Sequence, residues 1–263
     1  KIGLSLAKTF YENEDLKDEE YVSNHFVVMC TSKGQIKKTP LVSYSKPRQN
    51  GINAITIRED DQLLEAKLTT GSSQIMMAVK SGKAIRFEEE KVRPMGRTAS
   101  GVRGVTLAND KDEVVGMICV DDFNSDVLVV SENGYGKRSS IEDYRITNRG
   151  GKGVKTINVT DKTGNLISLK NVNDDNDLMV VNKSGITIRI SVADLRQMGR
   201  ATQGVRIIKL RGEDSIAAVA KVPASSEEES SEETDNTNIS ENITDSSENN
   251  TDVSDNNSSE TQE

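Results

Sequence analysis

The chain has 263 residues, and its 34 Lys and Arg against 42 Asp and Glu give a formal net charge of −8. The acidic excess comes from one end, because residues 223–263 hold thirteen acidic and no basic side chains. Residues 1–222 therefore carry 34 basic and 29 acidic side chains, a basic body joined to an acidic segment.

With Cys30, Cys119 and His25 alone, the composition excludes a disulfide framework and predicts no metal site. No signal peptide or apolar run of membrane-spanning length is present, which predicts a cytoplasmic protein without membrane contact.

The acidic segment consists almost entirely of Ser, Thr, Asn, Asp and Glu. Such a composition cannot bury enough apolar surface to offset the entropy lost on ordering, so we expect a disordered tail. The sequence thus divides into a repeat domain at residues 1–222 and an acidic tail at residues 223–263.

One pattern recurs four times along the repeat domain. In the first copy an apolar run at residues 26–30 leads into a turn at Gly34, a basic strand at residues 36–38 and a closing segment at Gly51. The later copies place turn glycines at Gly82, Gly134 and Gly185, and closing Gly-Val pairs at Gly101, Gly153 and Gly204. This spacing, close to 50 residues throughout, indicates a tandem repeat.

Each copy reads as a set of short strands. Apolar or β-branched runs entering a Gly turn are typical of β-hairpins. One further strand follows each closing segment, at residues 62–66, 113–118, 166–169 and 216–220. Four strands per repeat predict an all-β fold, a propeller-like array of four-stranded blades with four complete repeats. Residues 1–6 match the last strand of a preceding copy, so we expect the chain to begin inside a longer array.

Positive charge follows the same repeat. The stretches 35–57, 83–107, 135–159 and 186–210 together hold 21 basic and 6 acidic residues, whereas the rest of the repeat domain holds 13 basic and 23 acidic ones. Equivalent positions of a radial array lie side by side, so the sequence predicts a continuous basic band. Such a band suits a long polyanion, because Lys and Arg release counterions from phosphates.

Fourteen basic residues of these stretches are the predicted DNA contacts. They are Lys37, Lys38, Arg86, Arg93, Arg97, Arg103, Lys137, Arg138, Arg149, Lys152, Arg189, Arg196, Arg200 and Arg206. The chain has no Trp and few other aromatic residues, which favours sequence-independent binding of duplex DNA over stacking on single strands. The alternative is that basic runs are merely the solvated faces of exposed strands.

The sequence offers no catalytic constellation. The segment Gly134-Tyr135-Gly136-Lys137-Arg138-Ser139 is the nearest approach to a phosphate-binding loop, but Ser131 stands where the motif requires its leading Gly. A single His provides no catalytic triad. We therefore expect no catalytic residue and no cofactor in these 263 residues.

Three segments resemble the blade motifs of the A subunit of DNA gyrase, which is a bacterial type IIA topoisomerase. They are Met95-Gly96-Arg97-Thr98-Ala99-Ser100-Gly101-Val102-Arg103-Gly104-Val105, Asn133-Gly134-Tyr135-Gly136-Lys137-Arg138 and Met198-Gly199-Arg200-Ala201-Thr202-Gln203-Gly204-Val205. The resemblance covers residues 1–222 and implies a six-bladed β-pinwheel that wraps duplex DNA and supports ATP-dependent negative supercoiling. It also implies a nucleoid-associated cytoplasmic location, an A2B2 assembly with the gyrase B subunit, and ATP and Mg²⁺ bound elsewhere in the holoenzyme.

Two departures from the family pattern matter. The segment Arg149-Gly150-Gly151-Lys152-Gly153 is similar to the gyrase heptapeptide Gln-Arg-Arg-Gly-Gly-Lys-Gly, but Thr147 and Asn148 replace its first two residues and it lies in the third copy rather than in the first blade. The family's catalytic tyrosine belongs to an N-terminal region outside this sequence. Two alternatives stay open: the C-terminal domain of the topoisomerase IV counterpart of this subunit, and a propeller scaffold for protein partners.

Overall fold

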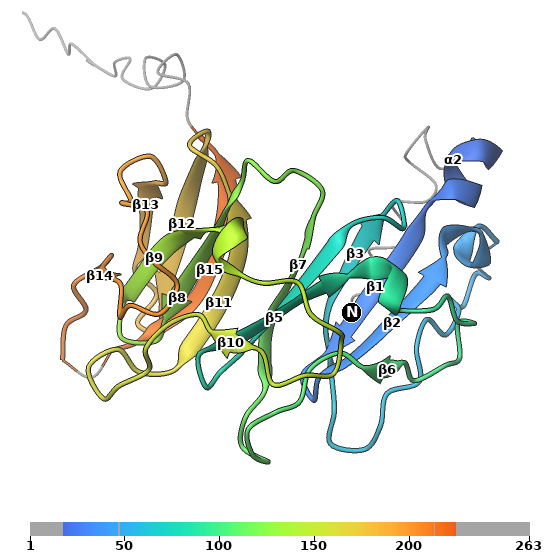
Figure 1. The fold of residues 1–263 in the computed structure, drawn as a ribbon, viewed down its shortest axis with the longest axis horizontal. Coiled ribbons are helices and arrows are strands. Elements are labelled where there is room, and N and C mark those ends of the chain that lie inside the picture. Colours follow the sequence, from blue (N-terminus) through green and yellow to red (C-terminus); the bar gives the residue numbers. More distant parts are fainter. Residues whose placement is uncertain (1–17, 47, 213, 225–263) are drawn as a thin grey trace, which may run out of the picture. The chain divides into compact units, whose positions relative to one another are not determined.

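A computed structural model describes residues 18–46, 48–212 and 214–224 (Figure 1). The expected strand at residues 1–6 and nearly all of the acidic tail lie outside the described residues. Within the described ranges, no helix is both long enough and apolar enough to cross a membrane.

Every repeat contributes three strands to a sheet of its own. The strands of the first two repeats are β1 (Phe26–Thr31), β2 (Gln35–Pro40) and β3 (Leu63–Thr69), followed by β4 (Gln74–Val79), β5 (Lys83–Glu88) and β7 (Val114–Val120). Those of the last two are β8 (Asp126–Ser131), β9 (Tyr135–Ser140) and β11 (Leu166–Val172), followed by β12 (Asn176–Asn182), β13 (Thr187–Ser191) and β15 (Ile216–Pro223). All pairings within these sheets are antiparallel, so the prediction of an all-β array of blades is confirmed.

The first two strands of each repeat form a hairpin because a glycine stands in the turn. Gly34 has a φ of +82°, a left-handed conformation that residues with a Cβ rarely adopt. Short helical segments flank the strands at α2 (Glu19–Asn24), η2 (Leu41–Tyr44), η3 (Glu89–Lys91) and η4 (Ile141–Asp143). The hairpins, which local turn chemistry specifies, thus appear where the sequence predicts them.

The fourth strand of a sheet comes from the next repeat along the chain. Strands β6 (Val102–Arg103), β10 (Val154–Lys155) and β14 (Val205–Arg206) begin at the Val of each closing Gly-Val pair. They pair with β2, β5 and β9, the second strands of the preceding repeats. The sheet orders are therefore β3-β1-β2-β6, β10-β5-β4-β7 and β11-β8-β9-β14. Repeats two to four therefore each contain four strands, as predicted, but one of the four joins the sheet of the preceding repeat.

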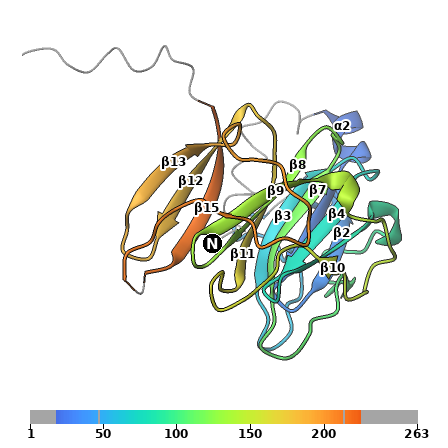
Figure 2. The same cartoon turned by 60° about the vertical axis from the view of Figure 1, so that its left-hand side comes forward.

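The fourth sheet has three strands in the order β13-β12-β15 among the described residues, and Figure 2 shows these three strands together. The difference follows from the exchange, because each fourth strand is supplied by a following repeat and no repeat follows this one among the described residues. No described atom lies within 4 Å of a Cβ built on Gly185, whereas the equivalent Gly34 faces the Val105 carbonyl oxygen at 2.9 Å.

The apolar core lies between consecutive sheets. Every residue of β4 is buried. Its residues Ile75, Met77 and Val79 belong to a cluster shared with the first repeat, which includes Val28 and Ile36. The alternating residues Met76 and Ala78 belong instead to a cluster shared with the third repeat. A strand that is packed on both faces needs apolar side chains at every position, not only at alternate ones. This explains the uninterrupted apolar segments that recur in the sequence.

Candidate nucleic-acid interface

The exchanged strands belong to longer segments that run along the edges of the preceding sheets. We call residues 93–105, 145–157 and 196–208 the exchanged segments. At one end of the first segment the Met95 amide donates to the Lys38 carbonyl oxygen at 2.8 Å, and at the other the Gly104 amide donates to the Gly34 carbonyl oxygen at 2.8 Å. Each segment is thus held to β2, β5 or β9 by backbone hydrogen bonds, which leaves its side chains free for other contacts.

The closing glycine allows this close approach of two backbones. Gly153 has a φ of +73°, and a Cβ placed on it would lie 2.5 Å from the Ala84 carbonyl oxygen. Gly101 and Gly204 have equally close contacts with the carbonyl oxygens of Ile36 and Gly136. The closing glycine of these three copies therefore has a packing role, in addition to its left-handed backbone.

Neighbouring exchanged segments contact one another. The Gly150 amide donates to the Gly104 carbonyl oxygen at 2.6 Å. The Arg149 guanidinium donates to the carbonyl oxygens of Lys91 at 2.9 Å and Arg103 at 3.1 Å. One repeat further on, the Arg200 guanidinium donates to the Lys155 carbonyl oxygen at 2.9 Å. The three segments therefore form one continuous surface across three sheets.

This surface carries charge of one sign. The exchanged segments contain ten basic residues and no Asp or Glu. Seven of the ten side chains are exposed, and the three at equivalent positions, Arg97, Arg149 and Arg200, are partly buried. We call these ten residues the basic rim: Arg93, Arg97, Arg103, Arg145, Arg149, Lys152, Lys155, Arg196, Arg200 and Arg206.

The structure brings eight of the fourteen predicted contact residues together on the basic rim. Arg145 and Lys155 complete it and were missing from the predicted set. A signal for both was present in the sequence, because Arg145 stands at the same repeat position as Arg93 and Arg196, and Lys155 stands at that of Arg103 and Arg206.

Two predicted contact residues are instead fully buried lysines. The Lys37 ammonium donates to the Ala54 carbonyl oxygen at 2.5 Å and also to the Arg97 carbonyl oxygen. The Lys137 ammonium donates to the Gly199 carbonyl oxygen at 2.6 Å. The acceptors at Arg97 and Gly199 belong to exchanged segments, so these lysines stabilise the backbone of the rim through buried hydrogen bonds. Their assignment as DNA contacts is corrected to a structural role.

The other four predicted residues occupy one repeat position, four residues after the turn glycine. Arg86 is buried and donates to Gln74 Oε1 at 2.7 Å and to the carbonyl oxygens of Ile141 at 2.6 Å and Tyr144 at 2.9 Å. Lys38 is buried and pairs with Glu89 at 2.9 Å. Arg138 pairs with Asp126 and Asp174, and Arg189 pairs with Asp177.

A basic residue at this position therefore recurs because it links a hairpin to neighbouring loops. The buried side chains of Lys38 and Arg86 have no access to a phosphate, and those of Arg138 and Arg189 already have carboxylate partners. Lys38 and Arg86 are therefore removed from the predicted DNA-binding set. Arg138 is partly buried and Arg189 is exposed, so their assignment as DNA contacts stays a prediction.

We expect the two buried lysines to make the free energy of unfolding increase as the pH rises above about 8. Burial, with the nearby charge of Arg97, lowers the pKa of Lys37 from 10.5 to about 8. Burial also lowers the pKa of Lys137 to about 8, although Asp143 opposes the shift. Between pH 8 and pH 10.5 each lysine is protonated in the unfolded chain but largely neutral in the folded one. The contribution of each lysine to stability therefore rises with pH in this range.

The test compares the unmodified chain with a double variant that carries Lys37→Ile and Lys137→Ile. Isoleucine is chosen because Ile85 and Ile188 stand at the equivalent position, three residues after the turn glycine, in the other two repeats. In urea titrations at pH 7.0 and 9.5, the free energy of unfolding of the unmodified chain should increase relative to that of the double variant. If the difference in free energy of unfolding between the two proteins were the same at both pH values, burial would not lower the pKa of these lysines.

Among the described residues, no group of three or more His, Cys, Asp and Glu side chains is placed to hold a metal ion. The two thiols are not poised for metal binding either. Burial raises the pKa of Cys119 to about 12 and raises that of Cys30 further, so neither thiol is ionised near neutral pH.

The fold and the rim define a class of protein: a strand-exchanged β-propeller-like repeat domain that presents basic segments along consecutive sheets. A family model described as "DNA gyrase C-terminal domain, beta-propeller" matches residues 25–70, 73–121, 125–173 and 176–223. The matches coincide with the four repeats and together cover well over half of the chain. The chain belongs to the DNA gyrase C-terminal domain family.

Individual relatives agree with this family. The DNA gyrase A protein of Staphylococcus aureus (strain NCTC 8325 / PS 47) is 42% identical over 242 residues, which is 91% of this chain and 27% of that protein. The chain thus spans about a quarter of the length of the relatives that it matches. A crystal structure of the C-terminal domain of DNA topoisomerase IV aligns with a TM-score of 0.72 at 23% identity, over 76% of this chain and 62% of that one. A DNA gyrase A C-terminal domain aligns with a TM-score of 0.67 at 24% identity, over 76% and 66%.

Proposed function

We propose that the chain binds duplex DNA along the basic rim, with little sequence preference, and wraps it. The observation that carries this proposal is the contrast between two groups of basic residues. Lys37, Lys38, Arg86 and Lys137 are buried against protein oxygens, whereas the ten residues of the basic rim cover three adjoining segments that contain no acidic residue. Cations aligned without counter-charges attract a polyanion, and binding to phosphates alone carries no sequence information.

The backbone of the rim favours a preorganised binding surface. Arg149 and Arg200 are each fixed by hydrogen bonds to carbonyl oxygens of the neighbouring segment. A side chain that is already ordered loses less entropy when it contacts a phosphate. Rim residues such as Arg103 and Lys152 are more exposed and extend the same surface.

Wrapping follows from the way in which the rim is distributed. Each exchanged segment is attached to a different sheet, so a duplex that contacts all three must follow the order of the sheets. Smooth bending of a short DNA site costs on the order of 1 to 6 kcal/mol, which several phosphate contacts together can offset. The proposal therefore predicts that binding and bending require the same residues.

In the whole protein, we propose that this chain serves as the DNA-wrapping part of the A subunit of a gyrase. That subunit would act with an ATP-hydrolysing B subunit in an A2B2 assembly that introduces negative supercoils. The identity of 42% to gyrase A chains supports this proposal over the topoisomerase IV alternative, for which the likeness is one of fold. Catalysis, ATP and Mg²⁺ would belong to other parts of the assembly.

The experiment that tests the proposal is fluorescence transfer between the labelled ends of a short duplex, measured with increasing amounts of the chain. We expect transfer to rise as the ends approach and to do so for unrelated DNA sequences alike. A chain that binds DNA without increased transfer would show binding without wrapping. Absence of binding at low salt would instead favour a scaffold for protein partners.

A further inference from the structure

A cavity of about 550 Å³ lies where the hairpin turn of the third repeat meets the segment that follows β14. Among the described residues, four cationic side chains and two carboxylates line it, a net charge of +2. The four cations are Lys162, Lys183, Arg206 and Lys209, and the carboxylates are Glu132 and Asp214. Only Arg206 belongs to the basic rim, so the cavity is a separate concentration of positive charge.

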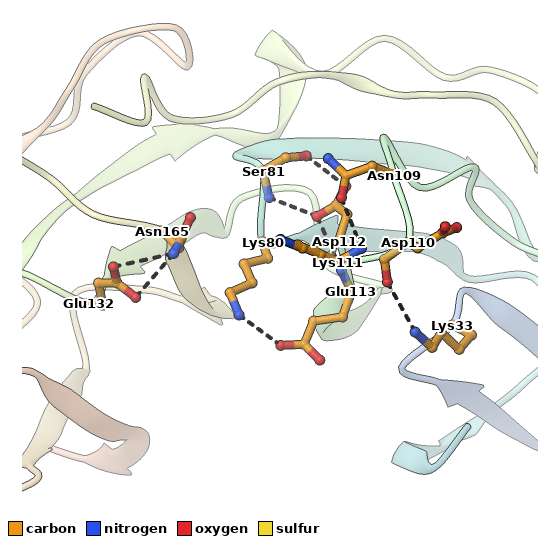
Figure 3. Close-up of polar contacts among 10 residues, drawn as sticks. All are labelled: Lys33, Lys80, Ser81, Asn109, Asp110, Lys111, Asp112, Glu113, Glu132 and Asn165. Atoms are coloured by element: carbon orange, nitrogen blue, oxygen red, sulfur yellow. Dashed lines mark hydrogen bonds and ion pairs between the residues drawn. The ribbon is translucent and has the colours of Figure 1, made fainter. Parts of the chain in front are cut away.

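The same place in the second repeat holds a lysine that is neutralised by a carboxylate. Figure 3 shows Lys80 paired with Glu113, at a distance of 3.3 Å between the ammonium and the carboxylate. The backbone amide of Lys80 also donates to the Glu113 carbonyl oxygen at 2.8 Å. In the fourth repeat the Lys183 amide donates in the same way to the Ser215 carbonyl oxygen at 2.9 Å. Lys183 is therefore the equivalent of Lys80, but Ser215 replaces its carboxylate partner.

The two carboxylates of the cavity are already engaged with neutral donors. Both Glu132 oxygens accept from the Asn165 amide at 3.3 Å, a contact that Figure 3 also shows. The Asp214 carboxylate accepts from the Ser184 hydroxyl and the Ser215 amide, each at 2.8 Å. Among the described residues, none of the four cations has a carboxylate within ion-pair distance.

Tyr135 holds two of these cations in place. The Lys162 ammonium and the Arg206 guanidinium each lie 5.4 Å from the centre of its ring, within the range of a cation–π contact. The Tyr135 hydroxyl accepts from the Arg206 guanidinium at 2.9 Å. Its own proton stays available as a donor to a ligand. Like charges around a solvent-filled cleft focus the field on an anion that enters it.

We propose that this cavity binds phosphoryl groups, and two adjacent ones in particular. Ammonium, guanidinium and phenol groups all donate hydrogen bonds to phosphate oxygens. The net charge of +2 among the described lining residues attracts a pyrophosphate unit, and the cavity has ample room for one. Its source is either a free di- or triphosphate or the backbone of a duplex that continues past Arg206. The second source depends on the proposed function, whereas the binding of free pyrophosphate does not.

Isothermal titration of the full chain with sodium pyrophosphate tests the proposal in the absence of DNA. We expect saturable binding that Lys183→Gln and Lys209→Gln each weaken by about tenfold, which corresponds to the loss of one charge-assisted contact. Ser215→Glu should abolish binding by giving Lys183 the partner that Lys80 has. The matched control is Lys80→Gln, which removes a lysine from the neutralised position and should leave pyrophosphate binding unchanged.

Equal binding by the chain with Ser215→Glu, or equal weakening by Lys80→Gln, would overturn the proposal. Thermal unfolding of each variant distinguishes lost binding from lost folding. Addition of a short duplex then identifies the source of the phosphates. Displacement of pyrophosphate by DNA assigns the cavity to the DNA path, and simultaneous binding of both assigns it to a free polyphosphate.

Discussion

Replacing Arg93, Arg103, Lys152 and Arg196 with Gln should greatly weaken duplex DNA binding and flatten its salt dependence. These four residues are exposed, lie on all three exchanged segments, and make no side-chain hydrogen bond or ion pair within the described part of the chain. Each phosphate contact contributes about 0.9 to the slope of log K against log salt, so the slope should fall by roughly 3 to 4. Fluorescence anisotropy of a labelled duplex between 50 and 200 mM salt measures both quantities.

The control removes the same charge from elsewhere on the surface. Arg58, Lys67, Lys111 and Lys221 are also exposed but lie outside the exchanged segments. Their replacement with Gln lowers the net charge equally and should change the slope by less than about 1, since only distant, screened attraction is lost. Equal losses in the two variants would mean that overall charge, and not the basic rim, determines binding.

Gly153→Ala should destabilise the chain by several kcal/mol. A left-handed conformation at a residue with a Cβ costs roughly 1 to 3 kcal/mol. The new Cβ would also lie 2.5 Å from the Ala84 carbonyl oxygen, and relief of such a clash costs about 1 to 3 kcal/mol more. Because β10 has only two residues, we expect the exchanged segment to detach from β5. Urea denaturation and hydrogen exchange of the Val154 amide measure these two effects.

Gly51→Ala separates the two contributions. Gly51 is the equivalent closing glycine of the first repeat and has a φ of +79°, but no described atom lies within 4 Å of the position that a Cβ would take. This variant should therefore show the conformational cost of roughly 1 to 3 kcal/mol alone. If the two variants were equally stable, close packing of the exchanged strand against β5 would not contribute to stability.

The sequence predicts the hairpins well, because each depends on residues close together in the chain. A glycine at Gly34 or Gly82 with apolar runs on both sides is sufficient to specify the turn and the two strands. The exchange of the closing strand was not predicted. Val102 pairs with Ile36, and nothing in the local pattern distinguishes that pairing from one within its own repeat. Only the packing of whole repeats determines which sheet receives the strand.

The candidate site was predicted in outline and corrected in detail for a similar reason. A charged side chain with recurring spacing suggests a shared role, but does not reveal whether that role is internal or external. Arg86 and Arg103 both recur with the repeat, yet Arg86 is enclosed by carbonyl oxygens and Arg103 is exposed. The absence of acidic residues from a segment was the more informative signal, because buried cations need partners and a binding surface does not.

Contact between DNA and the exchanged segments is the central claim. Modification of arginines by phenylglyoxal, with and without duplex DNA and followed by mass spectrometry, tests it most directly. We expect DNA to protect Arg93, Arg103, Arg145 and Arg196, which are exposed on the basic rim, and to leave the equally exposed Arg58 reactive. Protection of Arg58 together with undiminished modification of Arg103 and Arg145 would contradict the claim.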